Sequence, residues 1–245
     1  MGAEVCRTVA ADAGMVLAAA VAAAGGAGVA GIALSGDRAA LAAAGCTVAV
    51  DFTHPDAAPG NVDWCLDNGI HAVVGTSGFD AARLEELSRR ADAAGANVIV
   101  VPNFAIGAVL MMRFAELAAP FMDRVEVIEL HHDGKADAPS GTAQSTAERL
   151  STARDTVGGW ADRGDSSESV PGARGGIVGG VRVHSVRLPG LVAHQEVIFG
   201  ATGQTLTLRH DSIDRTSFMP GVLLAVRAVA GRPGLTVGLD PLLGI

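Results

Sequence analysis

The sequence predicts an α/β protein built from two domains, and three observations support this fold class. The 245 residues are 49% hydrophobic, which is enough for packed cores of ordinary size. Up to about residue 105, short apolar runs alternate with helical patterns, as in βαβ units with a parallel sheet. Beyond that point strand-like runs follow one another, which predicts an α+β domain with a mostly antiparallel, open sheet. We expect residues 1–105, completed by 219–245, to form the first domain and 106–218 the second.

The first domain is expected to begin with a long helix. Residues 2–24 are rich in Ala and Val and contain little turn signal, so a helix is predicted there. The strands expected after it are 29–34, 47–52, 71–74 and 97–101, and the expected helices are 38–44, 61–68 and 80–94. Ligands bind at the carboxyl ends of the strands in such a sheet. The loops at 75–78 and 102–104 lie at those ends.

The second domain is expected to combine helices with longer strands. Residues 125–130 (VEVIEL) alternate in polarity, as a strand with one buried face does. Residues 156–180 are rich in Gly, Ser and Asp and are expected to form a loop. The other expected elements are helices at 107–117 and 143–153 and strands at 181–188, 195–200 and 205–211. A final apolar helix at 217–230 is expected to pack back on the first domain.

Composition disfavours several classes of protein. No window of 18 or more apolar residues is free of charged or turn-forming residues, so no membrane span is expected. Glu4 and Arg7 follow Met1 closely, which does not fit a secretion signal. Three cysteines without CxxC spacing favour reduced thiols in a cytoplasmic protein. The net charge of −8 disfavours binding to nucleic acid, so an anionic ligand must meet local positive charge.

The segment 129–143 (ELHHDGKADAPSGTA) has the composition of an active site. It holds two adjacent histidines, His131 and His132, and Lys135, which is the only lysine among 18 basic residues. Imidazole transfers protons near neutral pH, and an ammonium supplies a compact positive charge or a second proton. Ser140-Gly141-Thr142 leads into the predicted helix, whose N-terminal N–H groups favour a carboxylate or a phosphate.

Two other interpretations of this segment remain open. It could be a capped helix that follows a polar loop with two solvated histidines. It could also ligate a metal, although adjacent histidines on an extended chain point to opposite sides. Because two kinds of proton-transfer group lie beside an anion-binding helix start, catalysis is the favoured interpretation, and no metal site is expected.

Several stretches of the sequence resemble one known family. The segment HHDGKADAPSGTA at 131–143 is similar to the signature of bacterial 4-hydroxy-tetrahydrodipicolinate reductase, or dihydrodipicolinate reductase, in its actinobacterial form. Further similar stretches are DFTHP (51–55), GIHAVVGTSGF (69–79), PNFAIGAVL (102–110), LVAHQEVIFG (191–200) and RHDSIDRTSF (209–218). This resemblance covers nearly the whole chain. It implies a Rossmann-like dinucleotide-binding domain, a substrate-binding and oligomerisation domain, and a cytoplasmic homotetramer that acts in lysine and diaminopimelate biosynthesis.

The resemblance also implies a role for each matching residue. His131 is implied as proton donor and acceptor, and Lys135 as a further proton donor. A hydride from NADH or NADPH would reduce a conjugated imine formed after loss of water, and a protonated group would quench the resulting anion. The residues implied to bind the substrate dicarboxylate are His132, Ser140, Gly141 and Thr142. The residues implied to border the cofactor are Gly75, Thr76, Ser77, Val101, Pro102, Asn103 and Phe104.

The chain departs from the family pattern at two places. The family opens with a strand and a G-x-x-G-x-x-G loop that cradles the cofactor pyrophosphate, and Met1-Gly2 matches the end of that loop. We expect Met1 to be an internal methionine of the loop; the alternatives are a cofactor-deficient remnant that assembles through its second domain, and a related imine reductase.

The second departure lies at the end of the next strand. The family has an acid there for the adenosine ribose, where this chain has Leu34. Ser35, Asp37 and Arg38 are candidate replacements, so the choice between NADH and NADPH stays open.

Overall fold

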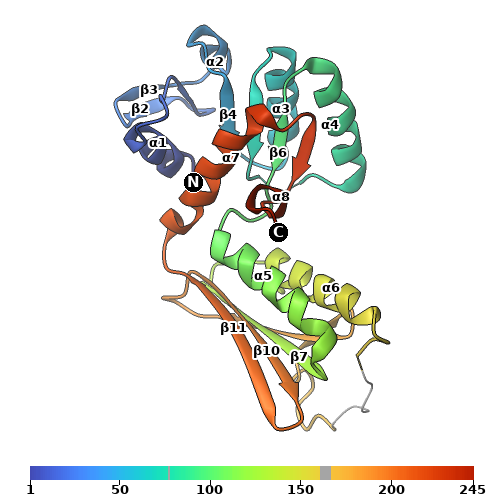
Figure 1. The fold of residues 1–245 in the computed structure, drawn as a ribbon. Helices are drawn as coiled ribbons and strands as arrows, with labels where there is room; N and C mark the ends of the chain where they lie inside the picture. The colour runs from blue at the N-terminus through green and yellow to red at the C-terminus, as the bar shows by residue number, and fades with distance from the viewer. Residues whose placement is uncertain (77, 161–166) are drawn as a thin grey trace. The chain divides into compact units, whose positions relative to one another are not determined.

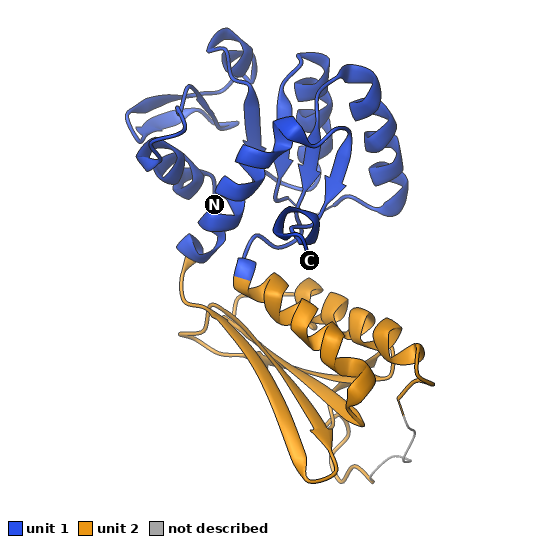
Figure 2. Ribbon diagram, viewed as in Figure 1, with its two compact units in different colours: residues 1–106, 215–245 blue, residues 107–214 orange. Residues whose placement is uncertain are grey.

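The computed structural model describes residues 1–76, 78–160 and 167–245. They form two compact units, which Figures 1 and 2 show as ribbons. Unit 1 contains Met1–Ile106 and Arg215–Ile245, and unit 2 contains Gly107–Asp214. Unit 2 therefore ends a few residues before the expected boundary at 218. None of the helices in the described ranges has the length and hydropathy needed to cross a membrane.

A four-stranded parallel sheet forms the centre of unit 1 (Figure 1). The strands, in the order β12-β6-β5-β4, are β4 (Val48–Asp51), β5 (His71–Val74), β6 (Val98–Val100) and β12 (Leu235–Val237). One face packs against α3 (Ala58–Asp67) and α4 (Ala81–Ala94) through Ala72, Val74, Val98 and Val100. The alternate residues Val73 and Ile99 point to the other face and are also fully buried. Both faces of the sheet are thus buried, which accounts for the apolar character of these parallel strands.

The predicted helix at 217–230 is present and belongs to unit 1. It is α7 (Met219–Ala228), which packs against β5 and against the first helix, α1 (Gly2–Ala11). A short helix, α8 (Asp240–Leu243), follows β12 and also packs on α7. The C-terminal segment Arg215–Ile245 thus lies in the same compact unit as Met1–Ile106.

Strand β12 was not expected from the sequence, and tertiary contacts explain its formation. It pairs in parallel with β6, from Leu235 opposite Val98 onward. Asn97, which precedes β6 and is nearly buried, also holds the chain that leads to β12. Its Nδ2 donates to the carbonyl oxygens of Val229 at 2.9 Å and Ala230 at 3.1 Å, and its Oδ1 accepts from the Gly234 N–H at 3.2 Å.

The prediction of one helix over residues 2–24 was wrong. Helix α1 ends at Ala11, where the Asp12 side chain accepts the Gly14 N–H at 2.9 Å and makes an ion pair with Arg227. The chain then extends and forms β1 (Ala20–Val21), which pairs in parallel with β3 (Ile32–Ser35). The high helix propensity of alanine is worth only tenths of a kcal/mol per residue, so sheet pairing overrides it. The strand after the first helix is therefore β1, and Leu34 does not end it.

The predicted strand at 29–34 was also wrong in its form, because the run VAGIAL turns back on itself. Ala30 and Gly31 both have positive φ, and they join β2 (Gly26–Val29) to β3 in a two-residue hairpin with Val29 opposite Ile32. Strands β1, β3 and β2 form a separate three-stranded sheet, which is followed by the short helix α2 (Ala39–Ala43). The glycine supplies the left-handed conformation that this turn requires.

Unit 2 is an open five-stranded sheet with two long helices, which Figure 1 shows on one side of it. The strand order is β11-β10-β7-β9-β8, and only the pairing of β7 with β9 is parallel among these strands. The helices bury Met111 of α5 and Leu150 of α6 against a core that includes Val127 and Phe199. The elements are α5 (Ile106–Ala118), β7 (Arg124–His131), α6 (Gly141–Asp155), β8 (Gly176–Val178), β9 (Val181–Arg187), β10 (Ala193–Ala201) and β11 (Gln204–Ser212). The predicted mostly antiparallel sheet is confirmed, while the predicted loop at 156–180 contains β8.

Candidate active site

Strand β7 carries one carboxylate on its buried face and one on its opposite face. Val125, Val127 and Glu129 alternate along the strand and are buried, with Glu129 at 0% exposure. Glu126 points the other way and is partly exposed. A carboxylate that is fully removed from water needs charged or hydrogen-bonding partners. Glu129 has such partners on three different elements.

The carboxylate of Glu129 receives N–H groups from His131, Arg187 and Ser140. His131 makes a short hydrogen bond from Nδ1 to Oε2 of Glu129. Arg187, at the end of β9, makes a two-pronged ion pair, with Nη1 2.9 Å from Oε2 and Nη2 2.7 Å from Oε1. The backbone N–H of Ser140 lies 3.3 Å from Oε1. The two-pronged geometry matches the planar guanidinium to the planar carboxylate.

Lys135 lies in the loop between β7 and α6 and is tied to the same cluster. Its backbone N–H donates to the His132 carbonyl at 3.2 Å, which closes a turn. Its Nζ donates to Oδ1 of Asp137 at 2.7 Å, and Arg187 Nη2 donates to the Asp137 carbonyl at 2.6 Å. Arg187 therefore holds both the buried carboxylate and the loop that carries the lysine. The imidazole of His132 lies beside Gly134 in this loop.

The N-terminus of α6 begins beside this cluster. Ser140 is the cap, and its Oγ accepts the Ala143 N–H at 3.2 Å. Ser140 is 4% exposed, whereas open space surrounds the position that a side chain at Gly141 would occupy. The N–H groups of the first turn and the helix dipole favour an anion at this end. The structure thus ties Ser140 to Glu129, which also binds His131, and Gly141 and Thr142 open the helix directly after it.

Burial and neighbouring charges shift the pKa values of the cluster. Burial raises the pKa of Glu129, but hydrogen bonds from Arg187, Ser185 and His131 outweigh it, so the net pKa is lowered. Burial lowers the pKa of His131, and the positive charges of Lys135 and Arg187 add to this effect. The bond to Glu129 opposes the shift without reversing it, so His131 is mainly neutral at pH 7.

The carboxyl ends of β4, β5 and β6 hold the residues predicted to border the cofactor. Asp51, the last residue of β4, organises this edge through its side chain. It accepts from the Thr76 hydroxyl at 2.8 Å, the Thr53 hydroxyl at 2.8 Å and the Asn61 amide at 2.9 Å. Thr76 follows β5, so Asp51 joins the ends of two neighbouring strands.

The loops after β5 and β6 meet through two aromatic rings. Phe52 and Phe104 lie with their ring centroids 5.4 Å apart, and both rings approach Gly75. Val101 donates its N–H to the Val74 carbonyl at 2.8 Å, and Asn103 Oδ1 accepts the Ala105 N–H at 2.9 Å. The structure therefore brings together Gly75, Thr76 and the loop 101–104. The predicted Ser77 lies outside the described residues.

The residues proposed to replace the missing ribose acid have local partners. The Ser35 hydroxyl bonds to the backbone of Asp37, and Asp37 accepts the Ala39 N–H at 2.9 Å, which opens α2. Arg38 donates to the Gly60 carbonyl at 3.0 Å and lies over the ring of Trp64. These contacts explain the conformation of the segment and leave the choice of nicotinamide cofactor open.

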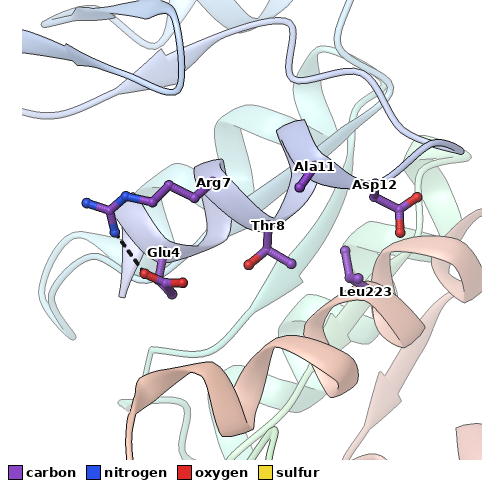
Figure 3. Close-up of a pocket in the computed structure, with 6 residues that line it drawn as sticks. All are labelled: Glu4, Arg7, Thr8, Ala11, Asp12 and Leu223. Carbon is purple, nitrogen blue, oxygen red and sulfur yellow. Dashed lines mark hydrogen bonds and ion pairs between the residues drawn. The ribbon is translucent and has the colours of Figure 1, made fainter.

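Two further features have no part in this chemistry. Figure 3 shows a pocket of about 390 Å³ between α1 and α7, lined by Glu4, Arg7, Thr8, Ala11, Asp12 and Leu223. The residues predicted to bind cofactor or substrate are not among these.

The cysteines are free thiols, and burial raises the pKa of Cys65 to about 11, so it is unreactive near neutral pH. Among the described residues, no group of three His, Cys, Asp or Glu side chains is placed to hold a metal.

Sequence reasoning missed the roles of Glu129 and Arg187. A signal for Glu129 was present, because it shares the face of Val125 and Val127 in an alternating strand, and a buried carboxylate there requires a partner. Arg187 lies more than fifty residues from His131 in the chain and has no local motif. Only the pairing of β7 with β9, which sets His131 opposite Arg187, brings them together.

By its fold and by the residues gathered at these strand ends, the chain is a two-domain α/β enzyme. Comparison with known proteins gives the family. Residues 1–104 match the family model "Dihydrodipicolinate reductase, N-terminus", and residues 107–243 match "Dihydrodipicolinate reductase, C-terminus". The chain belongs to the dihydrodipicolinate reductase family, and the resemblance seen in its motifs is confirmed.

Individual relatives agree with this assignment. The chain is 62% identical to a 4-hydroxy-tetrahydrodipicolinate reductase of Nocardia farcinica over 202 residues, which cover 82% of each protein. It is 61% identical to one of Mycobacterium marinum over 198 residues, or 80% of each protein. A solved dipicolinate-bound dihydrodipicolinate reductase from Paenisporosarcina sp. TG-14 is 37% identical, with a TM-score of 0.86 over 97% of this chain and 93% of that one.

Proposed function

We propose that this chain is an oxidoreductase that reduces 4-hydroxy-tetrahydrodipicolinate to tetrahydrodipicolinate, with loss of water, in lysine and diaminopimelate biosynthesis. One observation carries the proposal beyond family membership. The predicted proton donors His131 and Lys135 lie in one cluster with the anion-favouring N-terminus of α6. That combination suits a dicarboxylate that must be protonated. Unit 1 would bind the nicotinamide cofactor, and unit 2 would bind the substrate.

The carboxyl edge of the parallel sheet fits a dinucleotide. Ligands of such sheets bind at this edge, and the loops here carry Gly75, the Thr53 and Thr76 hydroxyls and the exposed residue Pro102. The hydroxyl oxygens of both threonines can accept hydrogen bonds from ribose while they donate to Asp51. The residues that would hold the cofactor are Gly75, Thr76, Ser77 and the loop Val101, Pro102, Asn103 and Phe104. NADH and NADPH are both proposed as cofactors.

The residues of unit 2 would bind and protonate the substrate. The N–H groups of Gly141 and Thr142 and the hydroxyl of Ser140 would bind one carboxylate, and His132 would contact the dicarboxylate from the loop. Lys135 would offset the negative charge and donate a proton. A bound nicotinamide supplies the hydride. His131, held at Nδ1 by Glu129, would present Nε2 to the substrate. In its doubly protonated form it would donate the Nε2 proton that completes the reduction and return to the neutral Nδ1–H ring.

The proposal also covers assembly and location. We propose a homotetramer formed through the open sheet of unit 2, in the cytoplasm. The outer strand β11 supports this, because most of its residues are partly or fully exposed, including Leu206. An uncovered apolar sheet edge is a site of self-association unless it is paired. Light scattering coupled to gel filtration measures the mass.

The test is a steady-state assay with freshly generated 4-hydroxy-tetrahydrodipicolinate, in which the absorbance of NADH or NADPH is followed. His131→Ala and Lys135→Ala should each lower kcat by roughly 10²- to 10⁴-fold, the usual contribution of a positioned acid or base. His184→Ala is the matched control, because His184 also bonds a glutamate of β7 but at Glu126. Wild-type turnover in both site variants would contradict the assignment. A wild-type chain that reduces only other imines would favour a related reductase.

A further inference from the structure

The position of Glu129 goes beyond the function proposed above, because this residue touches neither the substrate nor the cofactor in that scheme. Its carboxylate is fully buried and receives four N–H contacts from β7, β9 and the start of α6. Removing a carboxylate from water is expensive unless its partners are charged and well aligned. The chain therefore maintains a costly buried charge directly behind the candidate acid His131.

The bond to Glu129 determines which nitrogen of His131 is available. Nδ1 points to Oε2 of Glu129, so Nδ1 carries the hydrogen of the neutral ring. Nε2 is then the nitrogen that exchanges a proton with the substrate. A carboxylate in this position also stabilises the imidazolium that exists when both nitrogens are protonated. The charged groups that face His131 are Glu129 on its own strand, Lys135 in the following loop and Arg187 on β9.

The same carboxylate is linked to the other candidate residues. Through Arg187 it connects to the Asp137 carbonyl, and Asp137 holds the ammonium of Lys135. Through the N–H of Ser140 it connects to the cap of α6. Three separate parts of the site are thus attached to one ion pair, in which the Glu129 carboxylate is fully buried and Arg187 is partly buried.

We propose that Glu129 is the positioning residue of the active site, and that with Arg187 it holds His131 with Nε2 directed to the substrate and aligns the Lys135 loop with the α6 N-terminus. This inference rests on the proposed function for its kinetic consequences. Its structural part, the state of the His131 ring, can be measured without any substrate.

A second cluster on β7 provides a matched control. Glu126 binds His184 at 2.7 Å and makes an ion pair with Arg174, so it repeats the combination of carboxylate, imidazole and guanidinium. It lies on the opposite face of the strand and its side chain is 34% exposed. Glu126→Gln and Glu129→Gln make the same chemical change on the same strand. They differ in their histidine partner: Glu129 contacts the predicted acid His131, whereas Glu126 contacts His184.

The experiment compares wild type, Glu129→Gln, Glu129→Asp and Glu126→Gln. The first readout is the ¹⁵N NMR spectrum of the histidine rings against pH, without substrate or cofactor. In the wild type, His131 should carry its proton on Nδ1 when neutral. In Glu129→Gln its titration midpoint should move to lower pH, because the negative charge is gone and Arg187 and Lys135 remain.

The second readout is kcat and KM as functions of pH. Glu129→Gln should lower kcat about 10²-fold or more, with a smaller change in KM, since removing a carboxylate behind a catalytic imidazole costs up to about 10⁴-fold in other enzymes. Glu129→Asp keeps the charge and should recover part of kcat and the wild-type midpoint. Glu126→Gln should keep the wild-type kcat and pH profile.

Each outcome decides a separate point. An unchanged His131 midpoint in Glu129→Gln, or equal losses of kcat in both glutamine variants, would overturn the positioning role. If Glu129→Gln does not fold, the positioning role is tested by Glu129→Asp and by the wild-type spectrum. An Nε2–H neutral tautomer of His131 in the wild type would refute the proposed geometry. A wild type that shows the expected spectrum but no turnover would overturn the proposed function and leave the positioning of His131 supported.

Discussion

Replacing Gly75 by alanine tests the packing of the candidate cofactor edge. Gly75 follows β5, and its N–H donates to the Asp51 carbonyl at 2.9 Å, so its backbone is fixed against β4. A Cβ added there would lie 2.5 Å from Cζ of Phe52 and 2.8 Å from Cε2 of Phe104. Carbon atoms in good contact are about 3.5–4.0 Å apart, and Cε1 of Phe52 would lie closer still than these two atoms, so the rings or the strand end must move by more than about 1 Å.

The size of the effect follows from this overlap. Inserting atoms into a packed region costs roughly 1–3 kcal/mol, and for a chain of this size each kcal/mol lowers Tm by about 2–4 °C. The matched control is Gly60→Ala in α3, where no atom other than those of its chain neighbours and the local helix backbone lies within 4 Å of the added Cβ. Alanine is favoured over glycine within a helix by up to about 1 kcal/mol, so this variant should be as stable as the wild type or slightly more so.

Thermal unfolding followed by circular dichroism measures the stability, and quenching or enhancement of nicotinamide fluorescence measures cofactor binding. Gly75→Ala should unfold at lower temperature and bind NADH or NADPH more weakly than Gly60→Ala. Adding Phe52→Leu to Gly75→Ala removes the ring atoms on one side of the overlap and should restore part of the Tm. If Gly75→Ala keeps the wild-type Tm, or if Phe52→Leu restores nothing, the overlap is not what makes glycine necessary at this position.

Two further predictions concern stability. Asn97→Ala removes three hydrogen bonds to the segment 229–234 and leaves buried backbone groups unpaired, so the free energy of unfolding in urea should fall by roughly 2–4 kcal/mol; a loss below about 0.5 kcal/mol would contradict this. Acid should destabilise the chain through Glu129, because its pKa is lowered in the folded state. That stabilisation is present above the unfolded pKa of about 4.3 and is lost as the pH falls through the folded value. The difference in unfolding free energy between wild type and Glu129→Gln should therefore shrink below about pH 4.3, and a difference that stays constant down to pH 3 would contradict it.

The elements that the sequence predicted well are those with strong local patterns. The strand at 71–74 has its expected bounds, because an apolar run between a glycine turn and a glycine-rich loop leaves little choice. Alternation in VEVIEL likewise predicted β7. The prediction for the Ala-rich segment 2–24 failed because the helix preference of alanine is worth only tenths of a kcal/mol per residue, and the pairing of Ala20–Val21 with β3 outweighed it.

The residues of the candidate site likewise divide into those that the local sequence predicts and those that it does not. His131, Lys135 and Ser140 lie within ten residues, so their proximity could be predicted from the loop between a strand and a helix. The alternation along β7 also contained the information that Glu129 is buried, although its partners could not be named. Arg187 was beyond sequence reasoning, because its place depends on which strand pairs with β7 and in which register.

That pairing also explains why a mostly antiparallel sheet contains one parallel pair. The neighbour β10 runs antiparallel to β7, so the residue opposite His131 is Ala193, at the beginning of β10. The neighbour β9 runs parallel, so the residue opposite His131 is Arg187, at its end. Both β7 and β9 therefore finish at one edge, where the loop with Lys135 and the N-terminus of α6 also lie.

A parallel pair needs a long connection, and here that connection contains α6, which begins soon after β7 ends. The result is a single βαβ unit within unit 2, with its polar side chains at the carboxyl ends of the strands and a helix N-terminus beside them. Unit 1 places Asp51, Gly75 and Thr76 by the same rule at the ends of β4 and β5. The proposed cofactor and substrate residues would thus follow one structural principle twice, and in unit 2 the ion pair of Glu129 and Arg187 adds a side-chain link between the ends of the two paired parallel strands.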